Sequence, residues 1–323
     1  MSGPHGRLRL AVLAGFLGAG KSTWLRHALH QGGFGGALVL VNEAASASVD
    51  DVLLGRATGL EVLDGGCACC AGRGALVASL RRICDRRLRG APIARLVLET
   101  SGLADPAAIT QAIAEDPVLQ HHILVEETIV IVDALHGLAQ LREEPLSRRQ
   151  IAAADRIVVS KLDGAGRPAV ARLVATLCAT NPAARLAGSI MGSEVPLPES
   201  PGVAPEVWVD EARSSEAGAP ASPGEPRPPP IAEALDPGGP DSWPALSLWL
   251  SALIHARGDD IVRIKGVVRT PRGPLLLQSV RKVVQAPEIL PEGPQTEQAR
   301  LVVIGRGFTR AQLLRSLQRF AGG

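Results

Sequence analysis

The stretch GFLGAGKS at residues 15–22 decides the fold of the first part of the chain. It fits the pattern Gly-x-x-x-x-Gly-Lys-Ser, and it lies between an apolar run, LRLAVLAG, and a segment with helical spacing, STWLRHALHQ. A strand, this glycine-rich loop and a helix in this order form a P-loop, whose backbone N–H groups bind phosphate at the helix N-terminus. A glycine-rich turn without a ligand is the alternative, and the complete strand, motif and helix argue against it.

The P-loop assigns a role to each of its residues. We expect the nucleotide phosphates to be bound by Gly15, Gly18, Ala19, Gly20, Lys21, Ser22 and Thr23. Lys21 would reach the β- and γ-phosphates as a catalytic group, and Ser22 would hold Mg²⁺.

The rest of the chain falls into three parts. From residue 7 to about 190, apolar β-branched runs alternate with helical segments, which predicts an α/β P-loop NTPase domain with a mostly parallel sheet at residues 1–191. Residues 192–241 hold about half of the 25 prolines and predict a flexible linker. Residues 242–323 predict a small α+β domain, with Thr309 as the N-cap of its last helix.

Composition excludes some classes of function. The net charge is +2 and aromatic residues make up 2% of the chain, so we expect no nucleic-acid partner. The apolar run at residues 8–15 is far too short to span a membrane, and we expect no membrane partner. The default location is the cytoplasm, where thiols stay reduced.

Two further motifs lie at strand ends. The sequence SKLD at residues 160–163 resembles the Asn-Lys-x-Asp box of GTPases, in which Asp163 would recognise guanine, Lys161 would lie along the purine, and Ser160 replaces the usual Asn. A strand end with a surface lysine and aspartate is the alternative. The stretch VLETSGLADP, residues 97–106, resembles the Asp-x-x-Gly motif of GTPases with Glu99 in place of Asp. The resemblance implies that Glu99 would lie near Mg²⁺ and the attacking water, and that the Gly102 N–H would bind the γ-phosphate. Asp133, at a third strand end, either caps a turn or acts in the site.

Three cysteines in four positions, Cys67, Cys69 and Cys70, follow another strand and are flanked by glycines. Thiolates are soft ligands that suit zinc, cobalt or Cu(I), and Glu43 or water would supply a fourth ligand to zinc. Such an incomplete site suits a protein that releases its metal. A redox pair, a peroxide sensor, a structural metal site and inert buried cysteines are the alternatives. We expect Cys84 and Cys178 to be core residues.

The order and spacing of GFLGAGKST, VNE, GGCACC, LETSGLADP and ADRIVVSKLD resemble CobW-like P-loop GTPases, and the last segment resembles the C-terminal domain of that family. The resemblance implies a GTP hydrolase that acts as a metallochaperone or metal insertase for zinc or cobalt. Two features depart from the family: Ala44, Ala45 and Ser46 replace Phe, Gly and an acidic residue, and the linker lacks a His-rich run.

These observations combine into one hypothesis. GTP and Mg²⁺ order the segments around Glu43 and Glu99, the cysteines then bind zinc or cobalt, and slow hydrolysis of GTP releases the metal to a client metalloprotein. A homodimer is a candidate assembly. A nucleotide-regulated metal or redox sensor and a P-loop small-molecule kinase are the rival functions.

Overall fold

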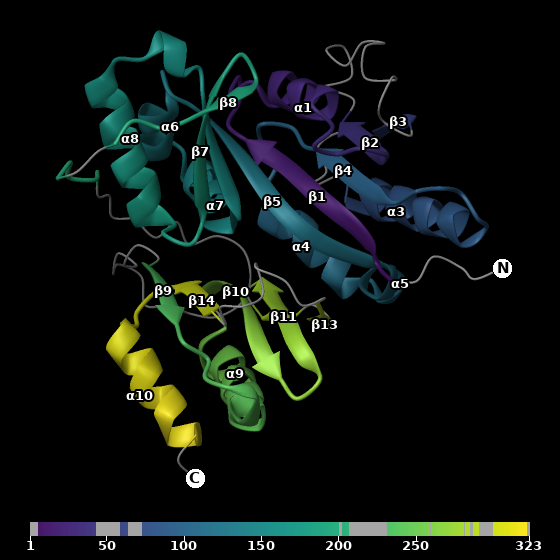
Figure 1. The fold of residues 1–323 in the computed structure, drawn as a ribbon, viewed down its shortest axis with the longest axis vertical. Coiled ribbons are helices and arrows are strands. Elements are labelled where there is room, and N and C mark those ends of the chain that lie inside the picture. Colours follow the sequence, from purple (N-terminus) through teal and green to yellow (C-terminus); the bar gives the residue numbers. More distant parts are fainter. Residues whose placement is uncertain are drawn as a thin grey trace. The chain divides into compact units, whose positions relative to one another are not determined.

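The computed structural model describes residues 6–42, 59–63, 73–199, 202–206, 231–258, 260–280, 282–284, 287–290 and 300–321. The chain divides into two compact units. One comprises Met1–Val174 with Ala184–Val203, and the other comprises Ala175–Ala183 with Ala204–Gly323. Each unit is described by itself (Figure 1).

The first unit contains an eight-stranded sheet in the order β3-β2-β4-β1-β5-β6-β7-β8. The strands are β1 (Leu8–Gly15), β2 (Ala37–Asn42), β3 (Gly59–Leu63), β4 (Arg95–Glu99), β5 (Ile123–Asp133), β6 (Arg156–Ser160), β7 (Arg185–Ile190) and β8 (Ser193–Val195). Neighbouring strands from β3 to β7 are parallel, and only β8 is antiparallel to its neighbour β7. The predicted mostly parallel sheet is therefore confirmed.

Helices follow most of these strands. They are α1 (Lys21–His30), α3 (Arg73–Leu88), α4 (Pro106–Glu115), α5 (Pro117–His122), α6 (Gly137–Glu143), α7 (Pro145–Ala153) and α8 (Arg167–Thr180), with a short 3-10 helix, η2 (Leu162–Gly164). The central strands are buried on both faces, because successive residues of β1 from Leu10 to Ala14 have exposed fractions of 1% or less. This explains why the strands read as continuous apolar runs.

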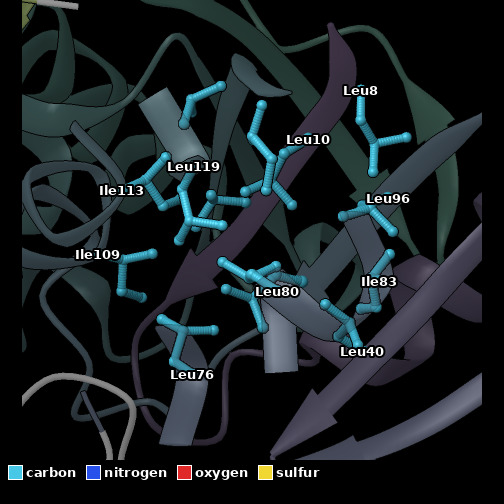
Figure 2. Packing of buried hydrophobic residues seen from close by; sticks show 14 of the residues in the cluster. Leu8, Leu10, Leu40, Leu76, Leu80, Ile83, Leu96, Ile109, Ile113 and Leu119 are labelled. Carbon is cyan, nitrogen blue, oxygen red and sulfur yellow. The ribbon is translucent and has the colours of Figure 1, made fainter. Parts of the chain in front are cut away.

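One face of the sheet packs on α3, α4 and α5. Figure 2 shows leucine and isoleucine side chains from β1, β2 and β4 meeting those of the three helices. The labelled members are Leu8, Leu10, Leu40, Leu76, Leu80, Ile83, Leu96, Ile109, Ile113 and Leu119. This core holds the carboxyl ends of the strands in one row, and the loops that leave that edge carry the site.

The second unit is built on an antiparallel sheet in the order β12-β11-β10-β14-β9, with β13 paired to β11. Its elements are β9 (Ile231–Leu235), η3 (Pro240–Ser242), α9 (Trp243–Arg257), β10 (Ile261–Thr270), β11 (Gly273–Val280), β12 (Val283–Val284), β13 (Glu288–Ile289), β14 (Arg300–Gly305) and α10 (Arg310–Ala321). Both helices pack on one face through a core that includes the buried Trp249.

The N-terminus of α10 is a reciprocal cap. The Gln312 N–H donates to Thr309 Oγ1 at 3.3 Å, and the Thr309 N–H donates to Gln312 Oε1 at 2.8 Å. The expected N-cap at Thr309 is confirmed, and the pair forms a capping box.

The expected linker at residues 192–241 is too long at both ends. β8 pairs with β7 in the first sheet, and β9 pairs with β14 in the second. Both strands are short, neither alternates apolar and polar residues, and prolines and glycines lie around them. Residues 207–230 lie outside the described part of the chain.

Candidate functional site

The loop between β1 and α1 has the backbone that a P-loop requires. Gly15 has φ 141°, and a Cβ at this position would collide with the backbone of Ile131 on β5. The Phe16 N–H donates to the same residue, Ile131 O, at 3.1 Å. Gly20, with φ 85°, turns the chain into α1. Glycine is required at such positions because a side chain is strained at positive φ.

Lys21 lies across this loop. Its Nζ donates to the carbonyl oxygens of Gly15 at 3.2 Å and of Phe16 at 3.1 Å. Burial lowers the pKa of the Lys21 amine, and the nearby Glu99 carboxylate acts in the opposite direction. The amine is thus held beside the backbone N–H groups that face phosphate in a P-loop.

Glu99 ends β4 directly beside the loop and is only 1% exposed. Ser22 Oγ donates to Glu99 Oε1 at 2.5 Å, while Glu99 Oε2 is buried with no hydrogen-bond partner among the described residues. Burial raises the pKa of the Glu99 carboxyl, and the Ser22 hydrogen bond opposes that shift. A buried carboxylate oxygen without a partner is costly, and a hydroxyl beside it completes an oxygen donor pair. The two residues therefore fit Mg²⁺, which prefers such ligands.

Gly102 packs directly on the P-loop. A Cβ at Gly102 would lie 2.6 Å from the Cα of Leu17 and 2.8 Å from its nitrogen. Only a glycine lets the segment after β4 approach the loop this closely. The segment then enters α4, whose N-cap Asp105 accepts from the Ala107 N–H at 3.0 Å.

The last residue of β6 and the residues after it lie beside the P-loop and the end of β5. Ser160 is 7% exposed, and its Oγ donates to Ala19 O at 2.7 Å, with Val132 O at 3.2 Å. Lys161 has a φ of 57°, and its Nζ pairs with Asp133 Oδ2 at 2.6 Å. Asp163 lies exposed in η2.

Asp133 holds this second segment in place. It is 2% exposed, and while one oxygen pairs with Lys161, Oδ1 accepts from the Leu135 N–H at 2.7 Å. Asp133 therefore caps the turn after β5, which was one of its two expected roles, and it also orients Lys161.

The structure brings some predicted site residues together and leaves others undescribed. Ser22 contacts Glu99, Gly102 contacts the P-loop at Leu17, and Ser160 contacts it at Ala19. Glu43, Cys67, Cys69 and Cys70 lie outside the described residues. Among the residues that are described, no three or more His, Cys, Asp and Glu side chains are grouped to hold a metal ion.

The strand before the cysteine segment and the helix after it are both described. The segment connects β3, which ends at Leu63, to α3, which begins at Arg73. Leu63 pairs with Asn42 of β2, and the preceding residue of β2, Val41, pairs with Glu99. Because neighbouring strands are about 4.8 Å apart, the segment begins roughly 10 Å from Glu99 along this edge.

The remaining two cysteines differ from each other. Cys84 is buried, and burial raises the pKa of its thiol to about 11, as fits a core residue. Cys178 is exposed, so its assignment to the core was wrong. It lies on α8, where the neighbouring Ala179 is exposed as well.

Gln150 was missed by the sequence reasoning. This α7 residue is 1% exposed, and its Nε2 donates to Gly102 O at 3.2 Å and to Ala104 O at 2.7 Å. Gln150 lies three residues after Ser147 on α7, and both are buried, but no sequence motif marks it, because its acceptors lie 48 and 46 positions away.

A P-loop on a parallel sheet, with a buried strand-end carboxylate bonded to the P-loop serine, defines the chain as a nucleotide-binding protein of the P-loop class. The family model for the CobW/HypB/UreG nucleotide-binding domain matches residues 9–187, and that for the cobalamin synthesis protein cobW C-terminal domain matches residues 234–321. The chain belongs to the CobW/HypB/UreG family.

Several relatives carry informative names. The zinc chaperone YjiA of Escherichia coli is 38% identical over 161 residues, which are 49% of this chain and 51% of YjiA. The zinc chaperone CobW of Pseudomonas aeruginosa is 28% identical over 224 residues, or 59% of each chain. The zinc-regulated GTPase metalloprotein activator 1 of Saccharomyces cerevisiae is 28% identical over 180 residues, or 49% of this chain and 42% of the relative. The chain thus spans about half the length of the curated relatives it matches.

A solved structure shares the fold. The crystal structure of Zn(II)-bound YjiA GTPase from Escherichia coli has a TM-score of 0.60 and 23% identity, and the match covers 98% of this chain and 99% of that one. No described helix has both the length and the apolar character needed to cross a bilayer.

Proposed function

We propose that this protein hydrolyses GTP and uses that reaction to control the binding and delivery of zinc or cobalt to a client metalloprotein. The observation that carries the proposal is the contact between Ser22 of the P-loop and the buried carboxylate of Glu99. A buried carboxylate at this place suits a cation-dependent reaction at a phosphate. The names of the relatives, zinc chaperones and a zinc-regulated GTPase, support the class of cargo.

Each residue of the site has a task in this proposal. The P-loop N–H groups bind the phosphates, and Lys21 balances the charge of the β- and γ-phosphates. Ser22 and Glu99 would hold Mg²⁺, which neutralises developing charge on the phosphate oxygens when bound. Gly102 would donate its N–H to the γ-phosphate. Water then attacks the γ-phosphorus, the bond to the bridging oxygen breaks, and the products are GDP and inorganic phosphate.

The base is read by the segment after β6. Asp163 would accept from the guanine N1–H and its exocyclic amine. Asp133 fixes the Lys161 amine, so the lysine stem is available to lie along the purine. Ser160 replaces the usual Asn, and its bond to Ala19 O links the base-binding segment to the P-loop.

The cargo would bind at Cys67, Cys69 and Cys70, with Glu43 as a candidate further ligand. The cysteine segment begins at Leu63, two strands from Glu99 in the sheet order. Glu43 directly follows Asn42, the last residue of the neighbouring β2, in the sequence. Loss of the γ-phosphate would therefore alter the positions of both segments. The metal affinity would then depend on which nucleotide is bound.

A competition titration tests the proposal. Zinc and cobalt(II) are titrated against a chromophoric chelator with GTPγS–Mg²⁺, with GDP–Mg²⁺ and without nucleotide. A coupling of about 1–3 kcal/mol corresponds to a 5- to 150-fold higher metal affinity with the triphosphate analogue. The variant with Cys67, Cys69 and Cys70 changed to Ser should lose this binding. Equal affinity in all three states would contradict nucleotide control, and a metal sensor would then be the better explanation.

A further inference from the structure

Gln150 occupies a position that the proposed reaction does not yet explain. Its side chain is 1% exposed and lies on α7, whereas both of its acceptors belong to the segment after β4. One amide nitrogen has two N–H donors, and here they serve two carbonyls two residues apart, Gly102 O and Ala104 O. A single buried side chain therefore clamps the turn that carries Gly102.

The orientation of the amide follows from its surroundings. Reversing the amide would place Gln150 Oε1 against two carbonyl oxygens, and acceptors repel one another. In the observed orientation, Oε1 is buried with no hydrogen-bond partner among the described residues. Leaving such an acceptor unpaired costs about 1–3 kcal/mol. The two bonds to Gly102 O and Ala104 O are kept despite that cost.

The clamped turn is in direct contact with the P-loop. Gly102 packs on the backbone of Leu17, and Ala104 is fully buried. The residue beside the clamp, Arg149, also contacts the segment through Asp105 Oδ2 at 3.2 Å, but both groups are partly exposed. An exposed pair of this kind contributes little. The buried amide thus contributes more to holding the turn than the exposed Arg149–Asp105 pair does.

We propose that Gln150 is a positioning residue that holds the Gly102 N–H in place for the γ-phosphate and so sets the preference for a triphosphate over a diphosphate. This inference rests on the proposed function, because it assigns Gly102 to the γ-phosphate. Gln150 acts through Gly102, so its loss should weaken triphosphate binding selectively. The P-loop, which binds the remaining phosphates, should be unaffected.

The test compares dissociation constants for GDP and GTPγS, each with Mg²⁺, in the wild type, Gln150→Met and Gln150→Glu. Methionine keeps the length but donates nothing, and glutamate places an acceptor against the two carbonyls. We expect the ratio of the GDP constant to the GTPγS constant to fall at least fivefold in both variants, with GDP affinity nearly unchanged. Arg149→Met is the matched control and should keep the wild-type ratio. An unchanged ratio in folded Gln150 variants overturns the proposal.

A second measurement uses the wild-type protein, in case the variants do not fold. With selective ¹⁵N labelling of glutamine, the Gln150 side-chain amide should shift and exchange more slowly with solvent when GTPγS replaces GDP. An identical signal in both states would overturn the proposal. Neither readout requires hydrolysis or a transition metal. A wild type that binds GTPγS but hydrolyses no GTP would therefore refute the proposed function and leave this inference to its own test.

Discussion

The buried carboxylate of Glu99 is unfavourable for stability but suited to binding a cation. Among the described residues, Glu99 is bonded through one carboxylate oxygen, and it is 1% exposed. Such a buried carboxylate destabilises the fold when it is ionised, yet this charge is what a cation at the phosphates requires. Lys21 lies nearby and opposes the penalty only in part, because burial also lowers the pKa of its amine. The charges of the site therefore lower the stability of the folded protein, as is common at functional sites.

The raised pKa of Glu99 predicts how stability depends on pH. A group that holds its proton more tightly in the folded state loses its contribution as pH rises through its folded pKa. We therefore expect Glu99→Gln to gain thermal stability relative to the nucleotide-free wild type as pH increases from about 4 to 8. Melting temperatures across a pH series measure this difference. The same variant should hydrolyse GTP about 10²- to 10³-fold more slowly.

Glu115 offers a matched control on the surface. Hydrogen bonds from Gln111 and Arg73 lower the pKa of its carboxyl, so Glu115→Gln should lose a small amount of stability as pH rises. A stability difference for Glu99→Gln that stays constant or shrinks with rising pH would contradict the first prediction.

At the scale of elements, most helices and strands could be predicted from the sequence. The continuous apolar runs predicted the parallel strands because both faces of the sheet are buried, and Thr309 marked the start of α10. β8 and β9 were missed because they are only three and five residues long and lie among prolines. Gln150 could not be placed, because its contact with Gly102 joins residues 48 positions apart.

The close approach of the β4–α4 segment to the P-loop gives a second prediction. Gly102→Ala places a methyl group 2.6 Å from the Cα of Leu17, and backbone atoms cannot move aside as a flexible side chain does. We expect a loss of about 1–3 kcal/mol in the free energy of unfolding, as for other overpacked positions. Denaturant unfolding measures it.

The same change should affect function, because the segment must move away from the P-loop to accommodate the methyl group. GTP hydrolysis should fall more than GDP affinity. Gly239→Ala is the control, since a Cβ there meets no atom within 4 Å. Equal stability and activity of both variants would show that the close packing at Gly102 has no consequence.

At the scale of the whole molecule, the two cores are built from separate stretches of the chain. One cluster draws on residues 8–125 and the other on residues 235–320, and the P-loop, Glu99 and Gly102 belong to the first stretch alone. A nucleotide that binds these residues stabilises the unit that contains them, because only the folded form of that unit binds it. The effect on the second unit depends on how strongly the units are coupled.

The third prediction follows from this separation. We expect thermal unfolding of the full chain to show two transitions, of which GTPγS with Mg²⁺ shifts only one. At a ligand concentration of 100 times its dissociation constant, the shifted transition should gain about 2.7 kcal/mol. Differential scanning calorimetry measures both transitions, and Lys21→Ala is the control in which the nucleotide should shift neither. A single transition that moves as a whole with nucleotide would instead mean that the units unfold together, so that nucleotide binding to the first unit also stabilises the second.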